Sequence, residues 1–114
     1  MASAGERAEA EVATYLQERR YKILDRNWRN KYSEIDIVAR QGQRIYIVEV
    51  KYRRNLEYGD GFDYITTEKK RRLRRAAAAW ALDNDWTGDM QIDVAAVTGA
   101  EFKIDYRANV IEPE

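Results

Sequence analysis

The segment RIYIVEVKY, residues 44–52, restricts the fold more than any other part of this sequence. Its alternating pattern predicts a β-strand, and apolar residues occupy both sets of alternating positions. One face carries Ile45 and Ile47 followed by Glu49 and Lys51, whereas the other face carries only valine and tyrosine after Arg44. Such a strand needs cover on both sides, which is typical of sheets that lie between helices. We therefore expect an α/β fold, a three-layer sandwich with a mixed central sheet flanked by helices.

The remaining sequence predicts the helices and the other strands that this sandwich needs. Apolar residues at helical spacing predict helices over residues 3–19 and about 67–84, the second capped by Thr66 or Thr67. Alternating segments predict four further strands, over residues 21–28, 33–40, 90–99 and 101–112. Because 114 residues is an ordinary length for one domain, residues 1–114 are expected to form a single domain.

Two residue types are missing, since the chain contains neither Cys nor His. Their absence excludes disulfides, thiolate nucleophiles, Ser-His-Asp triads and ordinary zinc sites. Any catalysis must use carboxylates, Lys, Tyr, Ser or Thr, and any catalytic metal should be a hard cation with oxygen ligands. Mg²⁺ and Mn²⁺ are the natural candidates.

Carboxylates occur where core residues are expected. In the first helix, Glu9 lies in the middle of an apolar stripe that contains Gly5, Val12, Ala13 and Leu16. An alternative is that the helix is turned slightly, so that Glu9 lies at the edge of the buried face beside an Arg. If Glu9 instead points towards the core, its carboxylate needs a partner.

The turn of the predicted hairpin decides whether the other carboxylates meet Glu49. A two-residue turn at Gln41-Gly42 sets Glu34 opposite Glu49, and a four-residue loop sets Asp36 opposite Glu49. Both place Glu34 and Asp36 on the face of Glu49, whereas an odd-length loop would bury Asp36 on the opposite face without a partner. We therefore expect an even-length turn.

The spacing E-x-K is unspecific by itself, because it occurs three times, at Glu49-Lys51, Glu68-Lys70 and Glu101-Lys103. Glu68 and Lys70 begin a helix, where residues two apart do not face each other. Glu101 and Lys103 alternate with apolar residues on a half-buried strand and should face water. Glu49 and Lys51 alone combine a strand with two apolar faces and acidic neighbours across a hairpin.

Crowded carboxylates raise each other's pKa, and a divalent cation relieves their repulsion. Asp36, Glu49 and the carbonyl of Val50 are the expected ligands of this cation, with Glu34 in a supporting position. Lys51 would orient or deprotonate a metal-bound water, so Asp36, Glu49 and Lys51 are the expected catalytic groups of a phosphodiester hydrolase. The alternative is a structural salt bridge between Glu49 and Lys51.

Charge is uneven along the chain although the formal net charge is zero. Residues 51–75 contain nine basic and four acidic residues, a net charge of +5, and residues 83–114 carry a net charge of −6. The basic side chains predict binding of a phosphate backbone, with a solvated helix face as the alternative reading. The expected nucleic-acid-binding residues are Arg53, Arg54, Lys69, Lys70, Arg71, Arg72, Arg74 and Arg75. Aromatic candidates for stacking on bases are Trp28, Tyr32, Tyr52 and Tyr58, for which core packing is the alternative.

The longest apolar run, AAAAWAL, is too short to span a membrane, and the first residues, MASAGERAEAE, lack the apolar core of a signal peptide. We therefore expect a cytoplasmic protein without a membrane partner.

Three segments carry a resemblance to a known family: SEIDIVAR, the following YIVEVKYR, and AEAEVATYL near the start of the chain. The first two resemble the G-E-I-D and E-V-K core, and the third the first helix, of the YraN-like family, small bacterial proteins of the restriction-endonuclease-like, or PD-(D/E)XK, superfamily. NWR at 27–29, YG at 58–59, the Lys-rich start of the second helix and IDVAAV at 92–97 are also similar. The resemblance implies metal on Glu9, Asp36 and Glu49, with Lys51 near the water. Ser33 and Ala8 stand where the family has Gly. The superfamily also includes archaeal Holliday-junction resolvases.

The leading hypothesis is a Mg²⁺- or Mn²⁺-dependent DNA endonuclease, with branched or damaged DNA as a candidate substrate. The alternative is a nucleic-acid-binding module without catalytic turnover, which would use the same basic helix. A third hypothesis is a protein-interaction domain whose oppositely charged segments pair with a partner or with a second copy in a homodimer.

Overall fold

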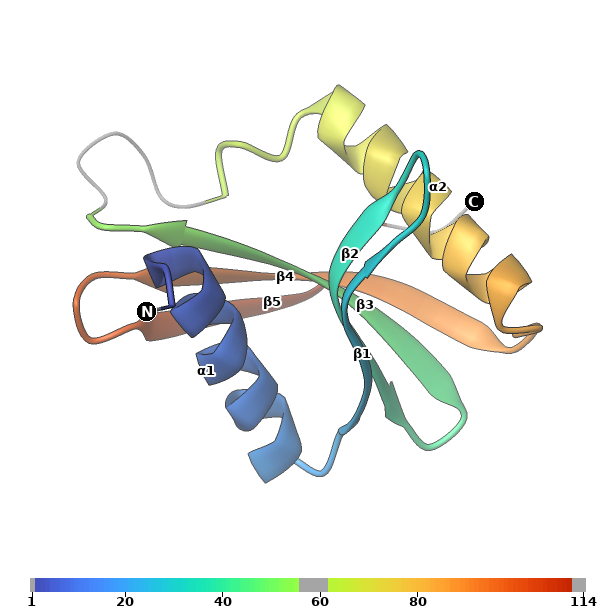
Figure 1. Cartoon of the computed structure of the whole chain (residues 1–114), viewed down its shortest axis with the longest axis horizontal. Coiled ribbons are helices and arrows are strands. Elements are labelled where there is room, and N and C mark those ends of the chain that lie inside the picture. Colours follow the sequence, from blue (N-terminus) through green and yellow to red (C-terminus); the bar gives the residue numbers. More distant parts are fainter. Residues whose placement is uncertain (1, 56–61, 112–114) are drawn as a thin grey trace.

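The strand that is apolar on both faces lies at the centre of a five-stranded mixed sheet with the order β1-β2-β3-β4-β5 (Figure 1). The computed structural model describes residues 2–55 and 62–111, apart from the side chain of residue 110. The predicted YG motif at 58–59, which includes Tyr58, and residue 112 of the last predicted strand lie outside the described residues. The bounds of the elements are α1 Ala4–Glu18, β1 Lys22–Arg29, β2 Glu34–Gln41, β3 Arg44–Arg53, α2 Thr67–Asp83, β4 Asp89–Thr98 and β5 Lys103–Ile111.

Three antiparallel pairs and one parallel pair form the sheet. β1, β2 and β3 make an antiparallel meander, and β4 runs parallel to β3 after the crossover through α2. β5 pairs antiparallel with β4. The last strand, β5, begins at Lys103 and not at residue 101 as predicted. Residues 99–102 instead form a turn in which the Phe102 N–H donates to the Gly99 carbonyl. Glu101 therefore lies exposed in this turn rather than in a strand.

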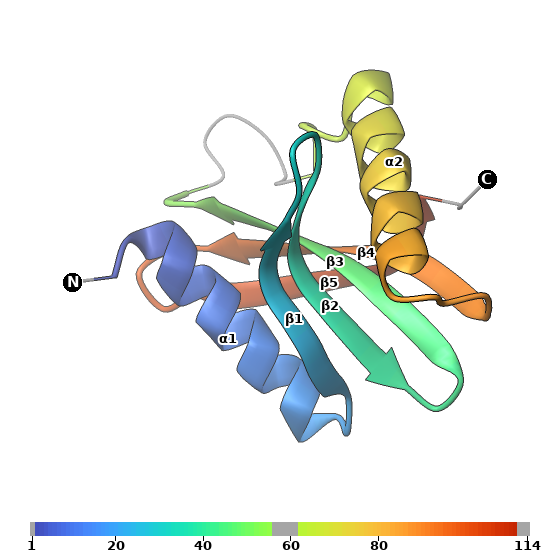
Figure 2. The same cartoon turned by 45° about the vertical axis from the view of Figure 1, so that its right-hand side comes forward.

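The two helices of the described structure cover opposite faces of the sheet, which confirms the predicted α/β sandwich (Figures 1 and 2). The α2 face buries Ile45 and Ile47 of β3 against Leu73, Ala76 and Trp80. The α1 face buries a separate cluster that includes Val12, Leu16, Val48 and Val97. β3 thus contributes alternate residues to two cores, as its sequence pattern predicts.

A side-chain hydrogen bond caps the N-terminus of each of the two helices. The Ser3 hydroxyl accepts the Glu6 N–H at 3.1 Å at the start of α1, and the Thr66 hydroxyl accepts the Lys69 N–H at 3.1 Å at the start of α2. The buried stripe of α1 begins at Ala8 and not, as expected, at Gly5. Gly5 lies in the exposed first turn, where it has no side chain to bury.

The hairpin register agrees with the prediction of an even-length turn. Gln41 pairs with Arg44 across the two-residue turn Gly42-Gln43, and the pairing continues to Ile37 and Val48. This register was expected for a four-residue loop, and its continuation by one residue would set Asp36 opposite Glu49, although the described pairs end at Ile37 and Val48. The turn is shorter because Gln41 and Arg44 also pair, and Gly42 supplies the positive φ of 61° that the turn requires.

Asp93 in β4 is a fully buried carboxylate that the sequence pattern did not single out. Its oxygens accept hydrogen bonds from Gln91 Nε2 at 2.8 Å, from the Asn109 N–H at 2.7 Å and from the Tyr106 hydroxyl. Asn109 has a positive φ of 54°, so Asp93 holds an irregular part of β5 in place. Since its hydrogen bonds are made within the sheet, we assign Asp93 a structural role.

Candidate active site

Asp36 lies directly beyond the point where the regular pairing of β2 with β3 ends. The described pairs of β2 with β3 end at Ile37 and Val48, whereas the pairing of β2 with β1 keeps one register past Asp36, although Asn27 in β1 has a positive φ of 53°. The alternation of side chains also breaks here, because Ile35 packs in the α2 core and Ile37 in the α1 core. The carboxylate of Asp36 therefore lies beside a gap between β2 and β3, with Oδ2 accepting the Val50 N–H at 2.8 Å.

The carbonyl of Val50 faces the same gap. In an extended strand the N–H and C=O of one residue point to the same edge, and the Val50 N–H points at Asp36. This places the predicted backbone ligand beside the predicted carboxylate ligand.

Glu49 points from β3 towards α2, and its side chain is 13% exposed. Oε1 lies 3.3 Å from Lys69 Nζ, in the first turn of α2. The pKa of Glu49 is raised to about 7, chiefly by burial and then by the neighbouring charge of Asp36, against the opposing effect of Lys69. The sequence predicted Lys51 as the cation beside Glu49, whereas the ion pair in the structure is made by Lys69.

Glu9 approaches Asp36 from α1, on the other face of the sheet. The pKa of Glu9 is raised to about 7, chiefly by burial and then by the charge of Asp36, and Arg26 of β1 opposes this rise. Burial also raises the pKa of Asp36, although the hydrogen bond from Val50 favours its charged form. Asp36 is thus coupled electrostatically to Glu9 on one side and to Glu49 on the other.

The three carboxylates do not form a ready-made cage. Within residues 2–55 and 62–111, no three acidic side chains come close enough together to hold a metal ion between them. Asp36 and Glu49 with the Val50 carbonyl nevertheless make a donor set of the type that suits Mg²⁺, which takes one or two carboxylates and keeps several waters. Direct metal binding by Glu9 remains a prediction.

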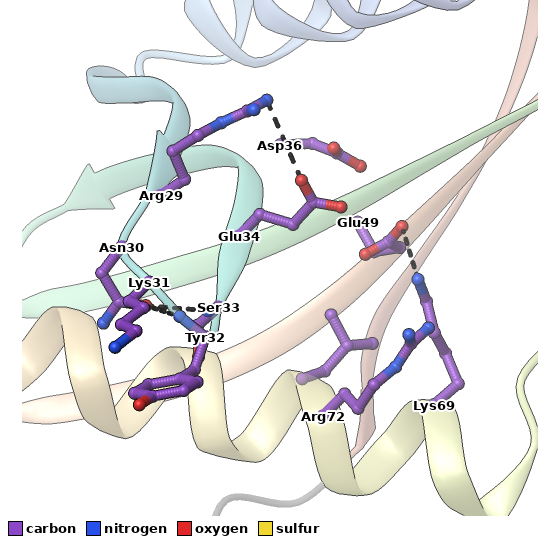
Figure 3. Close-up of a pocket in the computed structure, with 11 residues that line it drawn as sticks. Arg29, Asn30, Lys31, Tyr32, Ser33, Glu34, Asp36, Glu49, Lys69 and Arg72 are labelled. Carbon is purple, nitrogen blue, oxygen red and sulfur yellow. Dashed lines mark hydrogen bonds and ion pairs between the residues drawn. The ribbon is translucent and has the colours of Figure 1, made fainter.

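A pocket of about 290 Å³ opens beside Asp36 and Glu49, between the tip of the β1–β2 hairpin and the first half of α2 (Figure 3). Basic groups surround the carboxylates in this pocket. It is lined by Arg29, Asn30, Lys31, Tyr32, Ser33, Glu34, Asp36, Glu49, Lys69, Arg72 and Leu73. Glu34, predicted as a supporting carboxylate, is exposed here and lies 3.9 Å from Arg29. Polar groups and cations thus converge on a hollow that has acidic side chains at one end.

Lys51 lies on the same strand face as Glu49 but contacts a different group. Its Nζ lies 5.4 Å from the centre of the Tyr64 ring. The Tyr64 hydroxyl is buried, has no hydrogen-bond partner among the described residues, and has a raised pKa because of its burial and the charges of Glu49 and Asp36. Tyr64 was not predicted, because nothing in the segment DYITT distinguishes it from a packing residue.

The Arg and Lys residues that were predicted to bind nucleic acid lie in several different parts of the structure. Lys69 and Arg72 line the carboxylate pocket, whereas Arg71, Arg74 and Arg75 line a second pocket of about 760 Å³ with Thr67 and Met90. Arg71 pairs with Glu68 at 3.0 Å and Arg53 with Asp63 at 3.0 Å. Arg54 is exposed and Lys70 is half-buried. One helix therefore presents cations on two sides.

This arrangement defines a class of small α/β protein with paired carboxylates at an interruption of a mixed sheet. The sequence profile of the uncharacterised protein family UPF0102 matches residues 8–97, and the chain belongs to this family. It is the YraN family that the motifs predicted. Relatives include UPF0102 proteins of Rhodococcus jostii, 40% identical over 82% of this chain and 80% of the relative, and of Geobacter metallireducens, 39% identical over 96% and 93%. A UPF0102 protein of an Arthrobacter species is 43% identical over 82% and 80%.

Neither helix of the described structure has the length and apolar character that crossing a bilayer requires.

Proposed function

We propose that this protein is a metal-dependent endonuclease that hydrolyses phosphodiester bonds in DNA, with a restriction-endonuclease-like fold. The observation that carries the proposal is the carboxylate pair Asp36 and Glu49 beside the Val50 backbone, in a pocket rimmed by Arg and Lys. Asp36 lies between two further acidic groups whose pKa values are raised, and a bound cation would relieve their repulsion.

The donor set fits Mg²⁺ or Mn²⁺, because it consists of oxygen atoms alone and the chain has no Cys or His. Asp36, Glu49 and the Val50 carbonyl would hold the ion. When bound, it would polarise the phosphate and lower the pKa of a coordinated water.

The remaining groups of the pocket have separate tasks. Arg29 and Arg72 line the pocket and would hold the phosphates of the strand, since the guanidinium fork matches phosphate oxygens. Lys69 pairs with Glu49, and with an ion held by Glu49 its ammonium would be available to a phosphate oxygen. Lys51 stays the candidate for orienting the attacking water, with its ammonium held beside the Tyr64 ring.

Cleavage assays on linear, forked, flapped and four-way-junction DNA with Mg²⁺, Mn²⁺ or EDTA test the proposal. Wild type should cleave at least one substrate with metal and none in EDTA, and Asp36→Asn and Glu49→Gln should lose this activity. Glu101→Gln is the matched control, because Glu101 has the same E-x-K spacing but lies exposed in the β4–β5 turn. Equal metal-dependent cleavage by Glu49→Gln would show that the activity comes from elsewhere.

A second candidate function is nucleic-acid binding without turnover. It is favoured by the absence of a three-carboxylate cluster in the described part of the chain and by the cations on both sides of α2. Salt-sensitive DNA binding by a wild-type protein that cleaves nothing with either metal would support this function instead.

A further inference from the structure

Tyr32 is an exposed aromatic side chain at the mouth of the carboxylate pocket. Four aromatic residues were candidates for stacking on bases, and the structure separates them. Trp28 packs against the α2 core, and Tyr52 packs against Phe102 with its hydroxyl bonded to the Gly99 carbonyl at 3.0 Å. Tyr58 lies outside the described residues. Tyr32, by contrast, is 77% exposed.

The backbone that carries Tyr32 is held by a closed set of hydrogen bonds. Asn30 Oδ1 accepts the N–H of Tyr32 at 2.9 Å and the N–H of Ser33 at 2.8 Å, and the Ser33 carbonyl accepts the Asn30 N–H at 2.9 Å. This is the local side-chain turn that Asn favours. The ring is therefore presented from a fixed turn, which lowers the entropy lost when a ligand packs against it.

The surroundings of the ring are suited to a nucleic-acid strand. Figure 3 shows Tyr32 at the end of the pocket away from Asp36, with Lys31 beside it and Arg72 across the hollow. Lys31 Nζ lies 5.4 Å from the centre of the Tyr32 ring. One pocket thus offers a flat aromatic surface, several cations for phosphates, and the carboxylates of the proposed hydrolytic site. Exposed aromatic rings combined with a basic groove are typical of sites for single-stranded nucleic acid.

A ring in this position discriminates between nucleic-acid structures for a simple reason. In a continuous duplex both faces of each base are covered by neighbouring base pairs, so Tyr32 has no base face to contact. A base face becomes available only in a single strand or where the stack is interrupted, as at a frayed end or a fork.

We propose that Tyr32 is a stacking platform for an unpaired base, and that the substrate of this site is DNA whose base stack is interrupted near the scissile phosphate. This inference rests on the proposed endonuclease function for its scissile phosphate, but the stacking itself is measured by binding alone.

Binding in EDTA tests the inference without cleavage. The probe is a forked duplex with 2-aminopurine as the first unpaired base, and relaxed closed-circular plasmid serves as a competitor without ends. Wild type should quench the 2-aminopurine fluorescence and bind the fork in preference to the plasmid. Tyr32→Ala should weaken fork binding by about 5- to 150-fold, which is the range for one base–aromatic stack, and abolish the quenching.

Matched variants separate the contribution of the aromatic ring of Tyr32 from that of apolar bulk. Tyr32→Phe should keep wild-type fork binding, and Tyr32→Leu, which keeps apolar bulk without a flat ring, should behave like Tyr32→Ala. Leu82→Ala removes the other large exposed apolar side chain of the described structure, 82% exposed on α2, and should change nothing. Plasmid binding should be the same for all these variants. Equal losses of fork and plasmid binding in Tyr32→Ala, or no loss at all, would overturn the inference.

Failure of the inference can be told apart from failure of the endonuclease proposal. A wild type that binds forks through Tyr32 but cleaves nothing with Mg²⁺ or Mn²⁺ supports stacking and contradicts hydrolysis. Metal-dependent cleavage at unchanged sites by Tyr32→Ala, with unchanged fork affinity, supports hydrolysis and contradicts stacking.

Discussion

At the residue scale, the carboxyl groups of Glu9, Asp36 and Glu49 are half-buried and repel one another. Asp36 is held between Glu9 and Glu49 from opposite faces of the sheet, and burial disfavours the charged form of each. Their repulsion is removed either by protons or by a cation. The same groups should therefore control both the pH dependence of folding and the affinity for metal.

The pH dependence of stability is the first prediction. Glu9 and Glu49 have pKa values of about 7 in the folded protein, above the usual value of 4.5. Between these values the folded state binds protons that the unfolded state releases, so the metal-free protein should lose stability as the pH rises from about 4.5 to about 7. Urea unfolding across this range in EDTA measures the effect. Glu49→Gln should flatten the curve, whereas a wild-type curve that rises over the same range would contradict the assigned shifts.

A second prediction concerns Lys69, the ion-pair partner of Glu49. Because Lys69 lowers the pKa of Glu49, Lys69→Met should raise that pKa further above 7. ¹³C-NMR titration of Glu side-chain carboxyls follows the shift without any substrate. Lys70→Met, one residue along the helix, is the control and should leave the Glu49 titration in place. An unchanged midpoint in Lys69→Met would mean that the ion pair is absent in solution.

At the scale of the element, α2 has two tasks. Leu73, Ala76, Ala77 and Trp80 bury one stripe of the helix against the sheet, and Trp80 Nε1 donates to Asp25 at 2.9 Å. The polar positions present cations on the two sides of this stripe, towards two different pockets. The helix therefore connects the core with both basic surfaces.

The third prediction follows from this division. Simultaneous replacement of Arg71, Arg74 and Arg75 by Ala should weaken DNA binding on all sequences alike and reduce the salt slope by up to ~0.9 for each lost phosphate contact on duplex DNA. Cleavage at saturating DNA should persist, because these residues do not line the carboxylate pocket. Fluorescence anisotropy over a series of salt concentrations measures the slope, and an unchanged slope would assign DNA to another surface.

At the scale of the whole molecule, the proposed metal site should lower the stability of the metal-free protein, because its carboxylates repel one another. Asp36→Asn removes one of the repelling charges, and its side-chain oxygen can still accept the Val50 N–H. The variant should melt at a higher temperature than wild type in EDTA, by roughly 4 °C for each kcal/mol of strain relieved.

The response to metal completes this fourth prediction. Added Mg²⁺ or Mn²⁺ should stabilise wild type by about 2.7 kcal/mol at 100 times Kd, and Asp36→Asn should gain much less. Melting curves of both proteins with EDTA and with each metal decide the matter. A less stable Asp36→Asn in EDTA, together with no metal-induced shift in wild type, would favour a purely structural role for the carboxylates.

The sequence by itself determined the layers of the fold and the candidate ligands. Periodicity is a local property, so two apolar faces in residues 44–52 required helices on both sides, and the stripe of Leu73, Ala76 and Trp80 marked the buried face of α2. The penalty for a buried unpaired Asp36 excluded an odd-length turn. The motifs around Asp36 and Glu49 indicated the family. Each of these inferences depends on residues that are neighbours in the chain.

The tertiary structure alone decided which groups meet. Glu49 pairs with Lys69 instead of the nearby Lys51 because α2 crosses the sheet face above β3, a placement that no local pattern encodes. Asp36 lies between Glu9 and Glu49 because α1 and β3 bring these carboxylates to it from opposite faces of the sheet. Tyr32 is exposed while Trp28, four residues earlier, is packed, because the hairpin tip extends beyond the core. These contacts join distant segments, and their geometry follows from how the layers pack.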